Sequence, residues 1–541
     1  MPSPYARVPA VLLLFAALLP SQSNAVPGTD LTVYDVGTPT VYGRRGAAYP
    51  NGEIGVGFGH SYCNTGTVHL PWIGWVGASS TNVMLDTYPK IAFLLARESG
   101  GRMVQISGES YLKHSRVPFN FSSGPCAPCQ TGPTQTMRIG CSDTYSTGFN
   151  GDRYNLGPTT EIDPWLGSWN PVGSYFDVGD PAVSGTPATD GIQSLSFAQT
   201  SAFDAVKNRL EVRESSFVAG ATYYGQVHLM VKGEPVANRA NNLLSRGLTF
   251  TWNGSTWTTA LAGTNAAGSV LTRWTGSTNA MAGNGLDDGR FLVAVKVTGP
   301  TNGTWHYEYA VHNIDNARGG ASLRIPLCPT ARIANVGFKD VDQNLLNEWT
   351  TSQTPGELAF NAAANNPLDW NCIYNFWFDC DAAPVAGNVA IDEARIGAGA
   401  LTVNVGSQVP GFLGTEYLGD GCGTPAPTAY ATGLPTSPNP AFAVEFKVAP
   451  SALVVVGFSF AGASLDLGSG CTFFLQEPVA LLALANANGA GVARYDLPLA
   501  AGMTPVDWYC QGFEVVSGGP FLGFLAPTNG LRIRVAGTGC P

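Results

Sequence analysis

The chain has 541 residues, is rich in glycine (66) and proline (38), and is poor in charge, since Asp, Glu, Lys and Arg together make up 12% of it. Long disordered tails and coiled coils are excluded, because both need more charge and fewer aromatic residues than the 26 Phe, 19 Tyr and 12 Trp present. A net charge of -10, from 38 acidic and 28 basic residues without any run of like charge, argues against nucleic acid or an anionic membrane surface as a partner.

The first 25 residues have the pattern of a secretory signal peptide. One basic residue, Arg7, precedes an apolar stretch at 8–19, and a small-residue exit ends at Ala25. An apolar core of about twelve residues is short for the roughly twenty that span a bilayer, so cleavage is favoured over an uncleaved anchor. We therefore expect a secreted or cell-surface protein with no transmembrane segment in the mature chain.

Strand patterns dominate the rest of the chain. Residues 291–297 and 305–312 alternate between two faces, and 373–381 places three aromatic residues on one side. Turns rich in Gly, Asn, Asp and Ser separate such runs at short spacing. Helices are expected only in two short stretches, near 202–211 and 343–349.

The predicted fold class is all-β. We expect a large antiparallel β-sandwich or jelly-roll-like part over residues 26–405, either as one unit or as two subdomains that meet near residue 200. A stretch rich in Gly, Pro, Ser and Thr at 406–440 is predicted to be a linker and the start of a smaller module. This C-terminal module, over 416–541, is expected to be a disulfide-containing β-sandwich.

Residues with catalytic potential gather in the N-terminal part. The densest collection is His60, Lys113, His114, Ser142, Asp143, Asp152 and Glu161. The five candidate catalytic residues among them are His60, Lys113, His114, Asp143 and Glu161. In a shared cleft, a His or a carboxylate would act as general base and Lys113 would stabilise negative charge. The competing interpretation, which we favour, is that such side chains anchor disulfide-bonded loops through hydrogen bonds.

Two segments carry metal signals. Asp340, Asp342 and Asn344 match the start of a calcium-binding loop, but the glycine and glutamate that such a loop needs further on are missing. Calcium in another loop geometry is the one cofactor that the sequence suggests, and a turn with capping Asp residues is the alternative. His306 and Glu308 lie close enough on one strand face to share an ion, but a solvent-facing polar stripe is favoured.

Tryptophans suggest an extracellular partner. Six of them lie near Gly, Asn, Ser and Pro, where ring faces are available to stack on sugars: Trp72, Trp75, Trp165, Trp169, Trp252 and Trp257. Because most Trp side chains pack in cores, burial is the competing interpretation. The expected partners are extracellular glycans or envelope components, and not nucleic acid.

Eleven cysteines set the covalent framework. In an oxidising compartment we expect disulfides, and the odd count leaves at least one thiol free or paired between molecules. Two bridges are predicted in each of two groups: Cys63, Cys126, Cys129 and Cys141, and Cys422, Cys471, Cys510 and Cys540. Zinc or a redox pair is the alternative for the C-x-x-C of the first group. In the second, three pairings are open, and Cys422 with Cys540 is favoured as the tie between the ends of the module.

Several segments, in this order along the chain, are similar to a known group of proteins. They include SYCNTG at 61–66, YLKH at 111–114, GCSDTY at 140–145, YEYAVHN at 307–313 and NVGFKDVD at 335–342. Together they resemble uncharacterised secreted β-rich proteins of planctomycete-type bacteria. The C-terminal module, with GCG at 421–423 and LDLGSGC at 465–471, is similar to a Cys-containing β module that recurs at the ends of exported proteins from such bacteria.

This resemblance implies a compartment and an architecture, since the group has no established activity. The chain departs from the group's pattern at Cys372 and Cys380, which stand where other residues are expected. The resemblance implies an added bridge in a set that includes Cys328, with one of the three left unpaired.

Two functional hypotheses follow. The favoured one is a secreted or cell-surface β-sandwich protein with a binding or structural role in the envelope or extracellular matrix, with glycans as candidate ligands. The other is a secreted polysaccharide hydrolase or lyase with its site near His114 and Asp143. The second hypothesis requires its polar residues to converge in one cleft.

Overall fold

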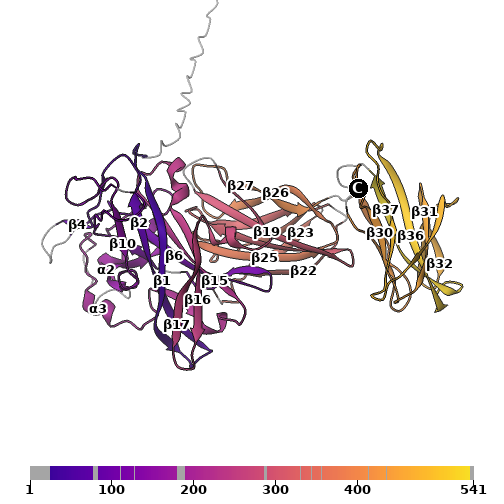
Figure 1. The fold of residues 1–541 in the computed structure, drawn as a ribbon, viewed down its shortest axis with the longest axis horizontal. Coiled ribbons are helices and arrows are strands. Elements are labelled where there is room, and N and C mark those ends of the chain that lie inside the picture. The colour runs from indigo at the N-terminus through magenta and orange to yellow at the C-terminus, as the bar shows by residue number, and fades with distance from the viewer. Residues whose placement is uncertain are drawn as a thin grey trace, which may run out of the picture.

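The computed structural model is built from antiparallel strands in three lobes that follow one another in a row (Figure 1). It describes residues 25–76, 83–109, 111–126, 128–179, 189–284, 289–328, 331–342, 344–354, 356–411, 414–433 and 435–535. The signal peptide predicted at 1–25 thus falls outside the described residues, apart from its last position. Within those ranges, no helix is long and apolar enough to cross a membrane. The all-β class is confirmed.

The N-terminal lobe is a sandwich of a four-stranded and a seven-stranded sheet. The first sheet contains β1 (Leu31–Gly46), β2 (Gly52–Asn64), β10 (Ser142–Tyr145) and β14 (Leu210–Arg213). The second contains β11 (Leu156–Pro158), β8 (Tyr111–His114), β6 (Lys90–Ser99), β15 (Thr222–Met230), β16 (Leu243–Trp252), β17 (Trp257–Ala267) and β7 (Arg102–Gln105). Three short pairs are added: β3 (Leu70–Pro71) with β9 (Thr136–Met137), β4 (Trp75–Val76) with β5 (Val83–Met84), and β12 (Ile162–Asp163) with β13 (Ser168–Trp169).

The core of this sandwich forms where the apolar faces of the two sheets meet. Phe58 of β2 packs edge-on against Phe93 of β6, with ring centroids 5.3 Å apart. Strand β2 is buried along nearly its whole length, because β1, β10 and β14 all pair with it. Side chains on β2 are therefore held on all sides.

Helices are few, short and confined to connections in the described chain. They are α1 (Thr147–Asn150), α2 (Tyr175–Val178) and α3 (Phe197–Ser201), with the 3-10 turns η1 (Arg153–Asn155), η2 (Thr159–Glu161), η3 (Glu214–Ser216), η4 (Val236–Asn241) and η5 (Val270–Arg273).

The two sequence-predicted helices are wrong. Residues 202–211 form a turn that leads into β14, because the side chain of Asp204 accepts hydrogen bonds from the backbone N–H groups of Val206 and Lys207 and competes with helix formation. The described part of 343–349 is also a series of turns.

The middle lobe is a second sandwich, formed by two five-stranded sheets. One contains β18 (Thr278–Gly283), β19 (Arg290–Thr301), β20 (Thr304–Asn313), β25 (Cys372–Cys380) and β22 (Ile333–Lys339). The other contains β23 (Thr350–Thr354), β24 (Glu357–Asn361), β21 (Gly320–Pro326), β26 (Pro384–Glu393) and β27 (Thr402–Pro410). The strands predicted at 291–297, 305–312 and 373–381 are confirmed as β19, β20 and β25, and their aromatic faces form the core.

The opposite face of β20 packs against the N-terminal sandwich. Glu308 is 4% exposed and His312 is fully buried. Side-chain amides join the lobes: Asn375 Nδ2 donates to the Met103 carbonyl at 2.8 Å, and Gln105 Oε1 accepts from the Ile373 N–H at 2.9 Å. The predicted solvent-facing stripe is therefore wrong for Glu308 and His312, because a second apolar cluster covers this face, whereas the His306 side chain stays partly exposed.

The division within residues 26–405 lies further along the chain than predicted. Strands β6 and β15, on either side of residue 200, pair with each other over nine residues. The change from the first sandwich to the second comes between β17 and β18. The pairing of β6 with β15 is long-range, so local turn and composition signals near residue 200 did not reveal it.

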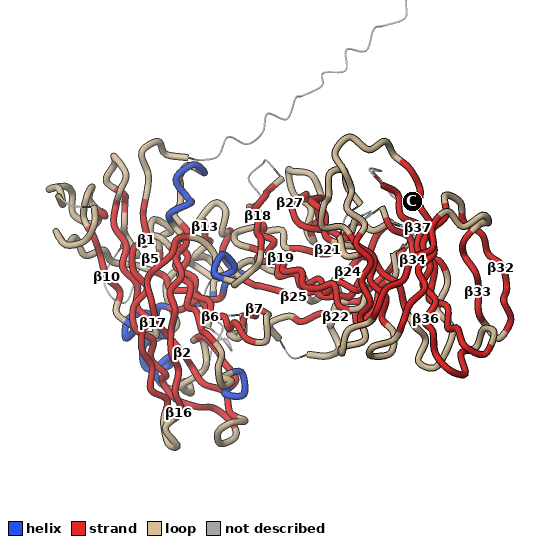
Figure 2. The backbone as a smooth tube through the Cα atoms, turned by 45° about the vertical axis from the view of Figure 1, so that its right-hand side comes forward, coloured by secondary structure: helices blue, strands red, loops and turns tan. Residues whose placement is uncertain are grey.

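The C-terminal lobe is the smaller β-sandwich (Figure 2). Its larger sheet contains β28 (Thr415–Leu418), β37 (Gly523–Val535), β36 (Val506–Gly519), β31 (Leu453–Ser459) and β34 (Leu481–Asn486). The smaller contains β29 (Thr428–Ala431), β30 (Ala443–Lys447) and β35 (Val492–Asp496), beside the hairpin β32 (Gly462–Gly468) and β33 (Cys471–Leu475). The predicted linker at 406–440 contains the end of β27 and all of β28 and β29.

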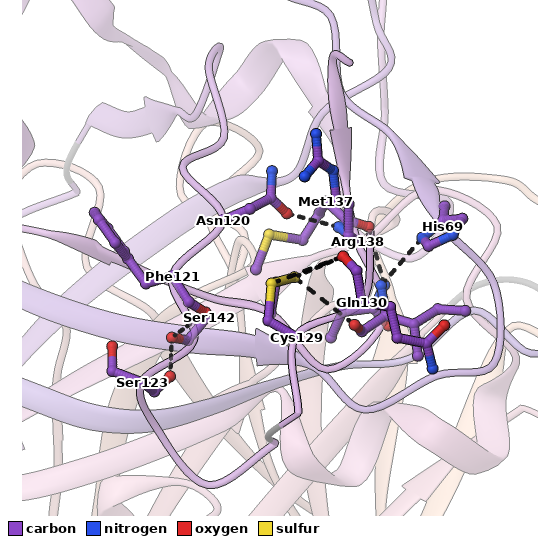
Figure 3. Close-up of a disulfide and its surroundings, with 12 residues drawn as sticks. His69, Asn120, Phe121, Ser123, Cys129, Gln130, Met137, Arg138 and Ser142 are labelled. Atoms are coloured by element: carbon purple, nitrogen blue, oxygen red, sulfur yellow. Dashed lines mark hydrogen bonds between the residues drawn. A yellow bond between two sulfur atoms is a disulfide. The ribbon is translucent and has the colours of Figure 1, made fainter. Parts of the chain in front are cut away.

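Disulfides confirm two bridges in the first group of cysteines. They join Cys63 to Cys126 and Cys129 to Cys141. Figure 3 shows the second, beside which the Ile139 N–H donates to His69 Nδ1.

The second group pairs differently from the favoured prediction. Cys422 is bonded to Cys471, 49 residues away, so Cys422 with Cys540 is wrong; Cys540 lies outside the described residues. Cys510 is a free thiol in the core, between β31 and β37.

The added bridge implied at Cys372 and Cys380 is also wrong. Both are free, buried thiols at opposite ends of β25, a nine-residue strand. At about 3.3 Å per residue the two lie far beyond disulfide reach. Cys328 is itself disulfide-bonded.

Removing the Cys422–Cys471 bridge should destabilise the C-terminal lobe. Closing a loop of 49 residues lowers the entropy of the unfolded chain, and its loss corresponds to about 4 kcal/mol. We expect the Cys422→Ser/Cys471→Ser double variant to lose about this much unfolding free energy in denaturant titrations. Cys510→Ala, which removes a buried thiol without opening a loop, is the control. Equal losses in the two proteins would contradict the loop account.

A candidate binding groove on the N-terminal sandwich

The residues nominated as catalytic lie in the core of the N-terminal sandwich. His60, Lys113, His114 and Asp143 are each at most 2% exposed, and Glu161 is half-buried. None of the five lines the groove or the cleft described below. Their hydrogen bonds show what they hold in place.

His60 and Lys113 together hold the short helix α1. Asn150, at the end of α1, donates from Nδ2 to His60 Nδ1 and to the Phe58 carbonyl, both at 2.9 Å. Lys113 Nζ donates to the Phe149 carbonyl at 2.7 Å. Because β2 supplies two of these acceptors and β8 the ammonium group, α1 is tied to both sheets of the sandwich. We call this arrangement the α1 clamp.

Burial disfavours the protonated, charged forms of His60 and Lys113 in the α1 clamp. The His60 ring packs against the rings of Tyr62 and Tyr145, with centroids 5.6 and 5.7 Å away. Burial, and then the charge of Lys113, lower the pKa of His60 to about 3. Burial also lowers the pKa of Lys113 to about 7. His60 is thus neutral, with Nδ1 as an acceptor for the Asn150 amide.

Asp143 and His114 are held in separate pairs. Asp143 Oδ2 accepts from the Tyr62 hydroxyl at 2.9 Å and from the Phe119 N–H at 3.0 Å, while burial raises the pKa of its carboxyl group. His114 Nδ1 contacts the Tyr88 hydroxyl at 3.0 Å, and burial lowers its pKa. In the described chain no hydrogen bond joins Asp143 to His114.

Glu161 also has a structural role. Its carboxylate accepts from Trp169 Nε1 at 3.1 Å and from the Tyr175 N–H at 2.7 Å, which joins η2 to β13 and α2. Burial raises the pKa of this carboxyl group. All five side chains thus take part in hydrogen bonds inside the fold, and the anchoring of disulfide-bonded loops stays a prediction.

An open groove lies on the surface beside the α1 clamp. Its volume is about 490 Å³, within the roughly 300–1,000 Å³ of ligand sites. Helices α1 and α3, the turn η1 and the segments next to them supply its lining: Ser146, Gly148, Phe149, Gly151, Asp152, Arg153, Phe197, Thr200, Ser201 and Arg209. We call it the α1–α3 groove. The groove brings together side chains from α1, η1 and α3, three connecting segments for which the sequence had predicted no strand.

Two exposed phenyl rings are the apolar part of the α1–α3 groove. Phe149 is 57% exposed and Phe197 is 62% exposed, although exposure of an apolar ring to water is unfavourable. Phe197 opens α3, whose start is fixed by a capping box between Ser196 and Gln199. Phe149 sits on α1, whose position the clamp sets. Both rings are therefore presented by anchored backbone.

Two arginines and one aspartate are the charged part of the groove. Arg153 Nη1 donates to the Phe203 carbonyl at 2.9 Å, and Arg209 donates from Nε to the Gly151 carbonyl at 3.0 Å. The Arg209 guanidinium lies 3.7 Å from the centre of the Tyr42 ring. Burial, and then the charge of Arg153, lower the pKa of Arg209 to about 10.

Asp152 is the acidic member of the groove. Its side chain accepts from the Tyr154 N–H at 3.1 Å and from Asn155 Nδ2 at 3.0 Å, and thereby caps η1. The groove thus carries two cations and one anion.

The tryptophans nominated for sugar stacking are mostly engaged within the fold. Trp72, Trp165 and Trp169 are at most 6% exposed, so the prediction is wrong for these three. At the tip of the β16–β17 hairpin, Trp252 stacks on Tyr49 at 4.6 Å. Trp252 also contacts Arg44 and Trp257, and Trp257 contacts Tyr49, Phe217 and Glu214. Trp75 is 37% exposed.

Two of the three proposed calcium ligands, Asp340 and Asp342, line a second cavity, a cleft of about 720 Å³ between the N-terminal and middle lobes. Asp342 accepts from the Asn344 N–H at 2.7 Å and from Asn347 Nδ2 at 2.9 Å, while Asp340 accepts from Asn366 Nδ2 at 2.6 Å. These bonds are those of an Asp-capped turn. No group of three or more His, Cys, Asp or Glu side chains in the described ranges is arranged to hold a metal ion. Calcium here stays a prediction.

The same cleft contains a pair of carboxylates, Glu53 and Glu211. Both form ion pairs with Arg45. Burial raises the pKa of Glu211, whereas the hydrogen bond from Arg45 lowers that of Glu53. The ion pairs of Arg45 with these two carboxylates join β1, β2 and β14.

Comparisons with known proteins identify no family. No family model and no curated protein matches the chain. Solved structures that it resembles include the major pilin subunit of Bacillus cereus, 10% identical over 64% of this chain and 87% of that one, with a TM-score of 0.18. A variant of that subunit is 10% identical over 57% of this chain and 79% of that one, with a TM-score of 0.18. The pilus 2b backbone protein of group B streptococcus is 10% identical over 43% of this chain and 88% of that one, with a TM-score of 0.16. Scores this low carry no argument about function.

Mild acid should destabilise the N-terminal sandwich. His60 has a pKa of about 3 in the fold against about 6.5 in an unfolded chain, so below about pH 6.5 the unfolded state binds the extra proton. The contribution of this group to stability is complete above about pH 7 and should fall by about 2 kcal/mol at pH 5. Denaturant unfolding at a series of pH values, followed by tryptophan fluorescence, measures this loss.

Two variants separate His60 from other titrating groups. His60→Gln keeps an acceptor for Asn150 but does not titrate, and should flatten the loss in acid. His306 has the opposite sign, because a hydrogen bond to Glu308 raises its pKa and its stabilisation is present at low pH. His306→Gln should therefore steepen the loss. An unchanged pH dependence in His60→Gln would show that this imidazole is not held neutral.

Proposed function

We propose that the protein is a secreted or cell-surface β-sandwich protein that acts by binding, and that an extracellular glycan occupies the α1–α3 groove. The observation that carries this proposal is the pair of exposed rings, Phe149 and Phe197, in one groove with polar side chains. Pyranose rings have an apolar face that packs on an aromatic ring and hydroxyl groups around their edge. The groove offers partners for both.

The polar partners surround the rings. Ser146 and Ser201 supply exposed hydroxyl groups, Asp152 supplies acceptor oxygens, and arginine side chains supply N–H donors. Such a mixture of apolar and hydrogen-bonding groups is typical of small-ligand sites. Because backbone hydrogen bonds fix α1, η1 and α3, little ordering is needed when a ligand binds.

The compartment is supported by independent features of the chain. The first 25 residues have a signal-peptide pattern, and three disulfides lie within the described ranges. The resemblance to secreted proteins of planctomycete-type bacteria points the same way. In this proposal the C-terminal module attaches or sorts the protein, and the N-terminal sandwich binds the ligand.

Removing a ring should weaken glycan binding. We expect Phe197→Ala to bind the preferred oligosaccharide about three- to tenfold more weakly, because a stacking contact is lost. A glycan array identifies the ligand, and isothermal titration calorimetry measures the affinity of both proteins. Phe524→Ala, at a ring 50% exposed on the C-terminal lobe, is the matched control and should bind like the parent protein.

Two outcomes would contradict the proposal. One is that no glycan on the array binds the full chain. The other is that Phe197→Ala and Phe524→Ala bind a glycan equally well, which would place the ligand outside the α1–α3 groove.

A further inference from the structure

The two arginines of the α1–α3 groove make no direct ion pair in the described chain, although the Asp152 and Asp204 carboxylates act on both at longer range. In the described chain, neither Arg153 nor Arg209 has a carboxylate oxygen within 4 Å of its guanidinium group; their acceptors are backbone carbonyls. Many other arginines meet a carboxylate: Arg44 with Glu214 at 2.6 Å, Arg290 with Asp315 at 2.5 Å, and Arg324 with Asp392 at 2.8 Å.

Backbone carbonyls hold the two guanidinium groups in place without cancelling their charge. Arg209 is fixed by the Gly151 and Ala205 carbonyls, the second at 2.8 Å, and by the Tyr42 ring beneath it. Arg153 is fixed by two carbonyls of the turn that follows α3, Phe203 and Asp204. Both side chains are thus ordered before any ligand arrives, which lowers the entropy cost of binding.

We propose that the ligand of the α1–α3 groove is an anionic saccharide, whose carboxylate or sulfate group binds Arg153 and Arg209. This inference rests on the proposed function, because it names the class of glycan that the groove takes. The sugar ring packs on Phe149 or Phe197, and the anion pairs with the guanidinium groups, which are suited to planar and tetrahedral oxyanions.

Charge within the groove favours a group with one negative charge. Two guanidinium groups and the Asp152 carboxylate line the groove, and the Asp204 carboxylate outside the lining also acts on both arginines. A uronate carboxylate or a sulfate ester adds one negative charge opposite the two guanidinium groups, whereas a phosphate monoester adds about −2 at neutral pH. The shared chemistry is a monoanion on a pyranose ring.

Three oligosaccharides of equal length test this inference on the full chain: oligogalacturonate, a sulfated galactan and a neutral galactan. Titration calorimetry at low and at high NaCl gives their affinities. We expect both acidic ligands, or one of them, to bind about tenfold or more tightly than the neutral one. The difference should shrink in high salt, because ions screen the charges.

Arginine variants identify the residues. Arg153→Gln and Arg209→Gln should each lose most of the preference for the acidic ligand, while Arg153→Lys should keep part of it, because the charge remains. Arg138→Gln is the matched control: this arginine also bonds a backbone carbonyl, that of Pro133, but lies outside the groove. Thermal unfolding of each variant shows whether the fold is intact. If a variant fails to fold, the salt dependence of ligand binding by the parent protein still tests the inference.

The outcomes separate this inference from the proposed function. If neutral and acidic ligands bind equally and Arg153→Gln changes nothing, while Phe197→Ala weakens binding, the groove binds glycans but the anionic class is wrong. If none of the three ligands binds, and the array shows no other glycan, both are wrong. An acidic preference that Arg138→Gln abolishes and Arg153→Gln does not would also overturn the inference.

Discussion

The α1 clamp is the interaction on which the candidate site depends. A four-residue helix has no stability of its own, so α1 exists because Asn150 is bonded to β2 and the Phe149 carbonyl to Lys113 of β8. The clamp works only while the His60 imidazole is neutral and offers Nδ1 as an acceptor. Burial thus sets the protonation state, the protonation state holds the helix, and the helix presents one wall of the groove.

Burial has a second consequence where the N-terminal and middle lobes meet. Small and apolar residues such as Ala310 and Ile373 let the sheet of β20 and β25 lie against β6 and β7, and the Asn375 amide crosses the contact. The first two lobes therefore share an apolar interface, while the polar cleft beside it is lined by paired charges. The groove lies apart from this interface, on the side of the sandwich that carries α1 and α3.

Sequence patterns predicted the strands of the middle lobe, the all-β class and two of the disulfides, because alternation and cysteine chemistry are local properties. They did not predict which face of β20 is covered, since Glu308 and His312 look polar until a second lobe packs on them. The partner of Cys422 and the extent of the first sandwich depend on long-range pairing and were wrong. His60 and Lys113 were noticed as reactive types, yet they act by positioning. Phe149 and Phe197 were missed because one exposed Phe in a turn carries no periodic signal.

The account makes one central claim: a glycan binds where the α1 clamp presents the α1–α3 groove. Hydrogen exchange of the full chain, measured by mass spectrometry with and without oligogalacturonate, tests it most directly, because exchange reports protection along the chain. The account predicts added protection in 146–153 and 197–209, and little change in the C-terminal lobe or around the cleft residues 340–342. Protection confined to the cleft or to the C-terminal lobe, with 146–153 and 197–209 unchanged, would contradict it.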